Sequence, residues 1–153
     1  MDILAPILIS IIAASTPLLF AAIGELVVEK SGVLNLGVEG MMLGGAVIAF
    51  IISVETGNSS LAIVAGAAMG AMMAGLFAVL TLGLLANQVA TGLALTLFGI
   101  GLSALLGQGY VGTPLTALPK LNIAGLTDIP ILGPVVFGQD ILVYLSFVVT
   151  AIV

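Results

Sequence analysis

Two short stretches of this largely apolar sequence combine polar side chains at helical spacing, and the first contains Asn35 and Glu39. They are four positions apart, so on a helix they would lie on one face, one turn from each other. A carboxylate within an apolar segment is costly in lipid, and Glu39 is therefore expected to face protein or water. Two interpretations of Glu39 stay open: it contacts a solute, or it only favours the N-terminal end of a helix through the macrodipole.

The second stretch contains Asn87, Gln88 and Thr91. Thr91 lies one helical turn beyond Asn87 and would share its face. Asn87 and Gln88 are interpreted either as a solvated turn between two helices or as the polar lining of a path that hydrogen-bonds a solute. Asn35, Glu39, Asn87, Gln88 and Thr91 are thus the candidate residues of a solute path.

The composition places these side chains in a membrane protein. Hydrophobic residues make up 61% of the 153 residues and charged residues 6%, whereas soluble domains are about 45–50% apolar and about 25% charged. Such a chain cannot cover a water-facing surface with polar groups. Its two cations, Lys30 and Lys120, are also too few to form a nucleic-acid surface.

The absence of two residue types excludes several kinds of chemistry. The sequence contains no Cys and no His, which removes disulfides, thiolate nucleophiles and the usual zinc ligands. A Gly-rich phosphate-binding loop ending in Lys-Ser or Lys-Thr does not occur in it either. We therefore expect no catalytic residue, no metal site and no cofactor.

Apolar runs of membrane-spanning length recur along the chain. Crossing a hydrocarbon core of about 30 Å takes roughly 20 helical residues. The runs that reach or approach this length are residues 3–23, 33–54, 61–85 and 89–106. A further run begins at Ile141, and its 13 residues would rise only about 20 Å. The sequence predicts an all-α, polytopic transmembrane helix bundle with about four full spans and a truncated fifth.

The segments between these runs are predicted to be connections. Residues 24–32 hold three charges between glycines and suit a short interfacial turn, residues 55–60 suit a polar loop, and residues 87–88 suit a hinge. Residues 108–140 are rich in proline and are expected to form a long extramembrane loop. Within it, the apolar run 131–137 is too short to span and is expected to rest on the bilayer or dip into it.

Glycines mark both interruptions and contacts of the predicted helices. Gly32, Gly37 and Gly40 are expected to loosen the second helix where they occur. Small residues at helical spacing are expected to let helices pack closely in lipid. They form three rows: Gly40 and Gly44; Gly66, Gly70 and Ala74; and Gly99, Ser103 and Gly107. A generic packed bundle, rather than a special dimer motif, is the simpler interpretation of these rows.

The stretch from residue 25 to residue 46 carries a family resemblance. Its pattern Glu29-Lys-Ser-Gly-Val-Leu-Asn-Leu-Gly-Val-Glu-Gly-Met-Met42 closely resembles permease subunits of ABC importers of the branched-chain amino acid, ribose and nucleoside type. It is most similar to the simple-sugar and nucleoside branch. Residues 86–95 match as well, and the resemblance covers nearly the whole chain. It implies a single transmembrane permease domain over residues 1–153, the N-terminal half of a longer permease.

The resemblance implies a function without covalent chemistry by this chain. It implies a permease subunit of an ATP-driven importer that moves a nucleoside or simple sugar across the bacterial cytoplasmic (inner) membrane. The implied partners are cytoplasmic ABC ATPase subunits, a second permease subunit and an external solute-binding protein. Two alternatives stay open. A secondary transporter or channel not driven by ATP would need intramembrane charges beyond Glu39, and a non-transporting scaffold subunit would not need a glycine-broken, polar second helix.

The resemblance also implies where the ATPase attaches. In the family, the cytoplasmic segment that grips the ATPase is a loop downstream of the helix that begins here at Ile141. These residues alone are therefore expected not to transport a solute. A neighbouring gene for an ATPase or a solute-binding lipoprotein would support the assignment.

The family's orientation has the last helix running inward, which gives a testable topology. Residues 55–60 and 108–140 are then outside, and residues 24–32 and 87–88 are inside, as the positive-inside rule favours for Lys30. Because the chain has no native Cys, Ser59→Cys is expected to react with an impermeant thiol reagent on intact cells. Ser31→Cys is expected to react only after permeabilisation, and its labelling on intact cells would reverse this topology.

Overall fold

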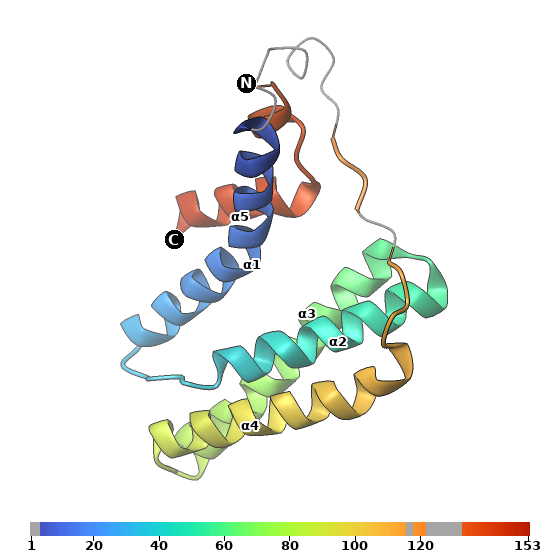
Figure 1. The fold of residues 1–153 in the computed structure, drawn as a ribbon. Coiled ribbons are helices and arrows are strands. Elements are labelled where there is room, and N and C mark those ends of the chain that lie inside the picture. Colours follow the sequence, from blue (N-terminus) through green and yellow to red (C-terminus); the bar gives the residue numbers. More distant parts are fainter. Residues whose placement is uncertain (1–3, 116–117, 122–132) are drawn as a thin grey trace. The chain divides into compact units, whose positions relative to one another are not determined.

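The computed structural model describes residues 4–115, 118–121 and 133–153, and most of them are helical (Figure 1). The α-helices of these ranges are α1 (Leu4–Lys30), α2 (Val38–Thr56), α3 (Ser59–Ala78), α4 (Gln88–Gly107) and α5 (Ile141–Ile152). α3 continues into a π-helical segment, Val79–Gly83, and α4 into a 3-10 turn, Gln108–Tyr110. The described ranges contain no strand, only an isolated antiparallel pair of Lys120 with Asp140. The predicted all-α fold is confirmed.

Within the described part of the chain, 4 helical stretches are long and apolar enough to cross a membrane. They are Leu4–Lys30, Val38–Thr56, Ser59–Gly83 and Gln88–Tyr110. The third and fourth agree closely with the predicted runs 61–85 and 89–106. α5 is shorter, with 12 residues. The number and order of the spans were therefore predicted correctly, whereas the boundary between the first two was not.

The first span runs through most of the turn that was predicted at residues 24–32, and that prediction is wrong. α1 ends in a hydrogen-bonded cap, in which Gly32 N donates to Glu29 O (2.9 Å). In the same cap Val33 N donates to Val28 O (3.3 Å). This Schellman arrangement requires a left-handed residue, which Gly32 supplies with φ 83°. Gly32 therefore terminates α1 instead of loosening the second helix.

The second span begins at Val38 rather than at residue 33. Asn35 explains the later start, because its side-chain Oδ1 accepts a hydrogen bond from Gly37 N (2.9 Å) and closes a local turn. Gly37 then forms the N-cap of α2, with φ −91° and ψ 0°. Gly40 lies within the regular helix, so the expectation that it loosens the helix is wrong.

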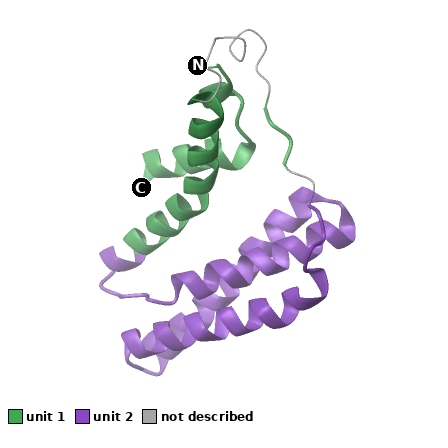
Figure 2. Cartoon of the chain, in the orientation of Figure 1, with its two compact units in different colours: residues 1–27, 117–153 green, residues 28–116 purple. Residues whose placement is uncertain are grey.

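The chain divides into two compact units, which Figure 2 shows in different colours. Unit 1 consists of residues 1–27 and 117–153, and unit 2 of residues 28–116. Unit 1 contains most of α1 and all of α5, and unit 2 contains α2, α3 and α4. The single permease domain over the whole chain stays a prediction.

In unit 2, α2 contacts both α3 and α4 extensively, while α3 and α4 hardly contact each other. Figure 1 shows α4 running beside α2. The buried core lies where the three helices meet, with Met41 from α2, Met73 and Phe77 from α3, and Leu95 from α4. In lipid such a cluster stabilises the bundle by close packing, because the surrounding acyl chains are as apolar as the side chains.

α2 and α4 approach each other backbone to backbone at Gly40 and Gly99. A Cβ atom added to Gly40 would lie 2.5 Å from Leu95 O and 2.7 Å from Thr96 Cα. A Cβ atom added to Gly99 would collide with the backbone of Gly40. Only glycine therefore fits on both sides of this crossing.

A second close approach joins α2 to α3. A Cβ atom on Gly45 would lie 3.0 Å from Gly66 O, and one on Gly66 would lie 2.9 Å from Gly45 O. Gly44 faces the flexible end of Met73, whose Sδ would lie 2.6 Å from an added Cβ. Gly70 has nothing within 4 Å of an added Cβ. The predicted rows thus contribute Gly40, Gly66 and Gly99 to two helix crossings in unit 2, whereas Gly45 was not among them and Gly70 lies outside both.

The turn between α3 and α4 is wound differently from an α-helix. Leu84 N donates to Val79 O (3.0 Å) and Ala86 N donates to Leu80 O (3.0 Å). Leu85 completes the turn with φ 54°, a left-handed conformation that costs a residue with a Cβ roughly 1–2 kcal/mol. This wide turn therefore connects α3 to the start of α4 and contains a strained residue, Leu85.

In unit 1, Asp140 caps the start of α5. Its Oδ1 accepts hydrogen bonds from Leu142 N (2.9 Å) and Val143 N (3.1 Å). One π-helical turn, Gly133–Phe137, precedes the cap. This turn forms most of the predicted apolar run 131–137, whose first two residues lie outside the described ranges. A position of this run on the bilayer stays a prediction.

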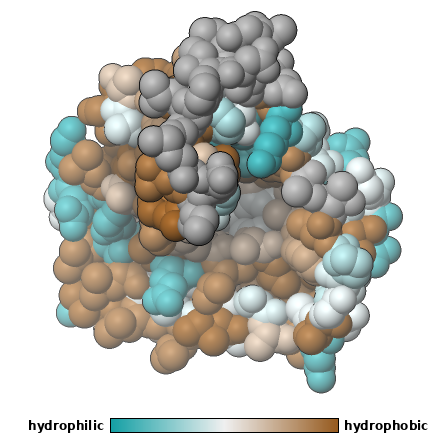
Figure 3. Space-filling model, turned by 45° about the horizontal axis from the view of Figure 1, so that its top comes forward, coloured by the Kyte–Doolittle hydropathy of each residue, from teal (hydrophilic) through white to brown (hydrophobic). Residues whose placement is uncertain are grey.

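Large apolar side chains are exposed over much of the surface. Met72 is 71% exposed and Leu97 is 70% exposed. Figure 3 shows hydrophobic residues, in brown, over much of the visible face, with hydrophilic patches between them. Soluble monomers rarely leave large apolar patches to water, and this surface suits a protein that lipid surrounds.

The crossing of α2 and α4 can be tested with two alanine substitutions on one helix. Gly99→Ala is expected to destabilise the protein, because its methyl group meets backbone, and overpacking of this kind costs about 1–3 kcal/mol. Gly101→Ala is the matched control, since an added Cβ there meets nothing within 4 Å. The control is expected to be neutral or stabilising by up to about 1 kcal/mol through helix propensity. Thermal unfolding in detergent measures both variants, and equal stability would contradict the crossing.

Candidate functional site

The linker, residues 33–37, joins α1 to α2 and lies along α4. Gln88 of α4 accepts a hydrogen bond through Oε1 from Leu34 N (2.8 Å). Thr96 of α4 donates through Oγ1 to Leu36 O (2.9 Å). The linker backbone thus obtains from α4 side chains part of the hydrogen bonding that a helix would have supplied.

The α4 residues that hold the linker share one face of the helix, because Gln88, Gly92 and Thr96 recur every four positions. Gly92 is buried, and a Cβ atom added to it would lie 2.8 Å from Leu36 N and 3.0 Å from Gly37 N. A side chain at this position would push the linker away. Gln88 binds the linker near its start, at Leu34, and Thr96 binds it near its end, at Leu36. The two bonds therefore fix the linker in one register along α4.

Asn35 holds the linker from within and is only 7% exposed. Besides the bond from Gly37 N to its Oδ1, its Nδ2 donates weakly to Met41 Sδ (3.6 Å). Because the linker is not helical, the prediction that Asn35 and Glu39 share a helix face is wrong. Asn35 thus binds the linker backbone through its amide oxygen and a side chain of α2 through its amide nitrogen.

Glu39 is the second residue of α2, and its side chain is exposed. The first N–H groups of a helix have no partner within the helix, and an acidic side chain in the first turn interacts favourably with them. This position suits the helix-end interpretation of Glu39. It also leaves the carboxylate accessible just beyond the linker, so contact with a solute stays a prediction.

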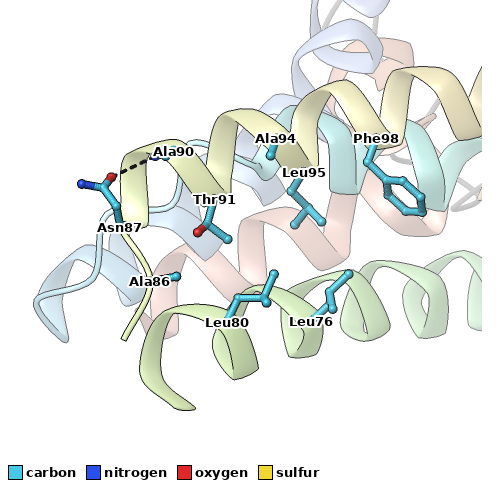
Figure 4. A pocket seen from close by; sticks show the side chains of 9 residues that line it. All are labelled: Leu76, Leu80, Ala86, Asn87, Ala90, Thr91, Ala94, Leu95 and Phe98. Atoms are coloured by element: carbon cyan, nitrogen blue, oxygen red, sulfur yellow. Dashed lines mark hydrogen bonds between the residues drawn. The ribbon is translucent and has the colours of Figure 1, made fainter. Parts of the chain in front are cut away.

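Asn87 and Thr91 line an open groove between α3 and α4, with a volume of about 460 Å³ (Figure 4). Asn87 caps α4, because its Oδ1 accepts a hydrogen bond from Ala90 N (3.0 Å). Thr91 is half-buried and points from α4 into the groove. The rest of the lining is apolar and includes Leu76 and Phe98.

The structure distributes the candidate residues over neighbouring places instead of gathering them in one. Asn35 and Gln88 hold the linker, and Asn87 and Thr91 line the groove. Sequence reasoning missed Thr96, which binds the linker as Gln88 does. The spacing of four and eight positions after Gln88 was the available signal for Gly92 and Thr96, but without the linker it looked like ordinary helix packing.

The opposite end of unit 2 carries a different contact. Tyr110 Oη donates to Glu55 Oε1 (2.8 Å) and thereby joins the end of α4 to the end of α2. The hinge at residues 87–88 lies beside the linker, at the other end of α4. The predicted topology requires this arrangement, with residues 55–60 on one side of the membrane and the hinge on the other. Which side faces the cytoplasm stays a prediction.

The family to which the chain is similar is described as the permease component of the branched-chain amino acid transport system, and its model matches residues 7–153. The chain belongs to this family. The matched part of the permease includes the linker, the groove and both glycine crossings. With its 4 helices of spanning length, the described part of the permease is that of a multi-pass protein of the cytoplasmic membrane.

Curated relatives of this permease are named as ABC transporter permeases. TsgC13 of Haloferax volcanii, provisionally named for glucose, is 40% identical over 157 residues, which cover 100% of this chain and 48% of the relative. NupC of Lactococcus lactis, named for nucleosides, is 32% identical over 149 residues, with 90% and 47% covered. NupQ of Bacillus subtilis, named for guanosine, is 30% identical with the same coverage. The predicted resemblance to the simple-sugar and nucleoside branch is confirmed.

The permease chain spans about half the length of the curated relatives it matches. No solved structure matches it.

Gln88 offers a test of the linker geometry. Gln88→Leu removes the acceptor for Leu34 N, and losing a hydrogen bond of this kind costs about 0.5–1.5 kcal/mol. Amide hydrogen exchange of the linker is therefore expected to become several-fold faster, as measured by mass spectrometry on the purified permease. Gln88→Glu is the control, because its carboxylate still accepts the bond and its charge suits the first turn of α4. Unchanged protection in Gln88→Leu would show that this hydrogen bond does not hold the linker.

Proposed function

We propose that the chain forms part of the permease subunit of an ATP-driven importer, which moves a nucleoside or simple sugar across the cytoplasmic membrane. The observation that carries the proposal is the family match over residues 7–153. The relatives named for glucose, nucleosides and guanosine support the substrate class. Because those relatives are about twice as long, the transport cycle is proposed for the whole permease rather than for this stretch by itself.

The proposed importer contains further subunits. Cytoplasmic ABC ATPase subunits hydrolyse ATP, so the permease itself performs no covalent chemistry. A second permease subunit completes the path, and an external solute-binding protein delivers the solute. The support for these partners is that the family and the relatives are permease components of ABC transporters.

We place the proposed solute path beside the linker. In many transporters the ends of helices and the non-helical backbone beside them supply binding groups, and the linker with the start of α2 offers groups of this kind. Asn35 and Gln88 act there as positioning residues, because their amides bind the linker backbone. Glu39 contributes an exposed carboxylate, an acceptor suited to the hydroxyl groups of a sugar or ribose. Asn87 and Thr91 add polar groups at the same end of α4.

Uptake measurements test the proposed function directly. The whole permease is expressed with its cognate ATPase and solute-binding protein in cells that lack their own uptake of guanosine and glucose. Uptake of one radiolabelled solute is expected, and it should disappear when the ATPase carries a substitution of its phosphate-binding lysine. Uptake that persists without a functional ATPase would overturn the ATP-driven mechanism.

Glu39 provides the sharpest test of the proposed path. Glu39→Leu is expected to abolish uptake while the complex still assembles, because the solute loses a charged acceptor. Glu39→Gln keeps the size and a carbonyl acceptor, and it is expected to retain part of the uptake. If Glu39 only favours the end of α2, the loss is about 0.3–1 kcal/mol of stability and uptake continues. Initial uptake rates per assembled complex distinguish the two roles of Glu39. An unchanged rate in Glu39→Leu would show that the residue takes no part in the mechanism.

A further inference from the structure

Beyond its polar end, the groove between α3 and α4 is apolar over more than two helical turns. α4 contributes Ala90, Ala94 and Phe98 to the lining, and Leu76 and Leu80 line the opposite wall. Figure 4 shows Phe98 pointing from α4 toward the wall that carries both leucines. The distance along α4 from Ala90 to Phe98 is about 12 Å at 1.5 Å per residue. The groove is therefore long enough to hold a stretch of helix.

A polar solute does not suit this apolar length. A sugar or a nucleoside carries several hydroxyl groups, and each one without a partner in apolar surroundings costs about 1–3 kcal/mol. The lining offers side-chain polar groups only at Asn87 and Thr91, which are close together near the start of α4. The polar end can face a solute path, but the remainder of the groove cannot replace the solute's water.

Lipid acyl chains are also a poor match to the groove. On the side turned away from Ala94 and Phe98, α4 presents large side chains, such as Leu93 and Ile100, which are 53% and 45% exposed. Toward the groove it presents Ala90 and Ala94, four positions apart. Small residues at this spacing let a second helix backbone come close, and such contacts drive association between helices in lipid. The groove face therefore has the character of a helix–helix interface.

A source for that helix is present in proteins of this family. The chain covers only 48% of TsgC13 and 47% of NupC, so these permeases contain about as much sequence again. Transmembrane helices in that further sequence would pack against the part that this chain covers through side-chain contacts. In unit 2 the groove is where one added helix would contact α3 and α4 at once, since these two hardly contact each other.

We propose that the groove receives a transmembrane helix from the half of the permease that these 153 residues do not include. This helix packs its small and apolar side chains against Ala90 and Ala94. Leu76 and Phe98, which are 44% and 52% exposed, close over its sides. This packing joins α3 to α4, so that α2, α3, α4 and the added helix form a four-helix bundle. Thr91 stays at the polar end of the groove.

Photo-crosslinking in native membranes tests the occupant of the groove. The photoreactive residue p-benzoylphenylalanine replaces Phe98, one aromatic side chain for another. The variant is expressed as the whole permease, including the residues beyond these 153. Ile100→p-benzoylphenylalanine is the matched control, because this position on the same helix is exposed and does not line the groove. After irradiation, mass spectrometry identifies the adducts. The probe at position 98 is expected to label a permease peptide outside residues 1–153, and the control is expected to label mainly lipid.

Other results from the probe at position 98 would overturn the proposal. Adducts with lipid alone, or no protein adduct, would show an open groove. A covalent dimer of this chain would show that a second copy fills it. An adduct with residues 4–30 or 141–152 would show that a helix of this same chain does so. None of these readouts depends on transport, so the proposal can fail while the proposed function stands.

A pair of tryptophan substitutions gives an independent measurement. Ala94→Trp fills the groove and is expected to lower the yield of folded permease in detergent roughly tenfold, as overpacking at a helix contact does. Ala104 is exposed on the same helix and does not line the groove, so Ala104→Trp is expected to leave the yield near that of the unmodified protein. Equal yields of the two variants would show that no helix occupies the groove.

Discussion

The backbone contact between Gly40 and Gly99 sets the geometry of the rest of unit 2. With no side chain between them, α2 and α4 lie close enough for α4 to reach the residues that precede α2. Thr96, one turn before Gly99, then binds Leu36 O, and Gly92, two turns before Gly99, lies against the linker. A larger residue at the crossing would move α4 away from all of these contacts together.

The linker is a connection between two spans whose backbone conformation is held by side chains. A buried backbone group without a partner costs about 1–3 kcal/mol. Side chains of Gln88, Thr96 and Asn35 bind three backbone groups of the linker. These bonds give the linker a defined conformation beside the start of α2. A solute path built there would have its polar groups in place before the solute arrives, which lowers the ordering cost of binding.

The fold class and the spans could be predicted because the bilayer fixes them: its thickness sets the length of apolar runs and its chemistry demands helices. The helix ends were less accessible. The predicted turn rested on the charges of Glu25, Glu29 and Lys30. Charged side chains are, however, compatible with the last turns of a helix. The backbone conformation of Gly32 decides where α1 ends. Charge alone could not show this.

The sequence indicated which polar residues belong to the candidate site, but it did not indicate which groups they bind. Asn35 and Gln88 stood out as polar residues in apolar sequence, yet the bond from Leu34 N to Gln88 joins positions 54 apart in the chain. Such a pair exists only once the glycine crossing has brought α4 against the linker. Thr96 was missed for the same reason, since a threonine in a membrane helix ordinarily binds its own helix backbone.

The π-helical segment, Val79–Gly83, is a place where the length of this chain could change by one residue. A hydrogen bond from Leu84 N to Val79 O spans one residue more than an α-helical bond does. A relative with one residue fewer there would close into a regular α-helix, and a rotation of about 100° would be absorbed in the turn before Asn87 caps α4. A one-residue deletion in this segment would therefore leave the α4 face of Gln88, Gly92 and Thr96 in register with the linker.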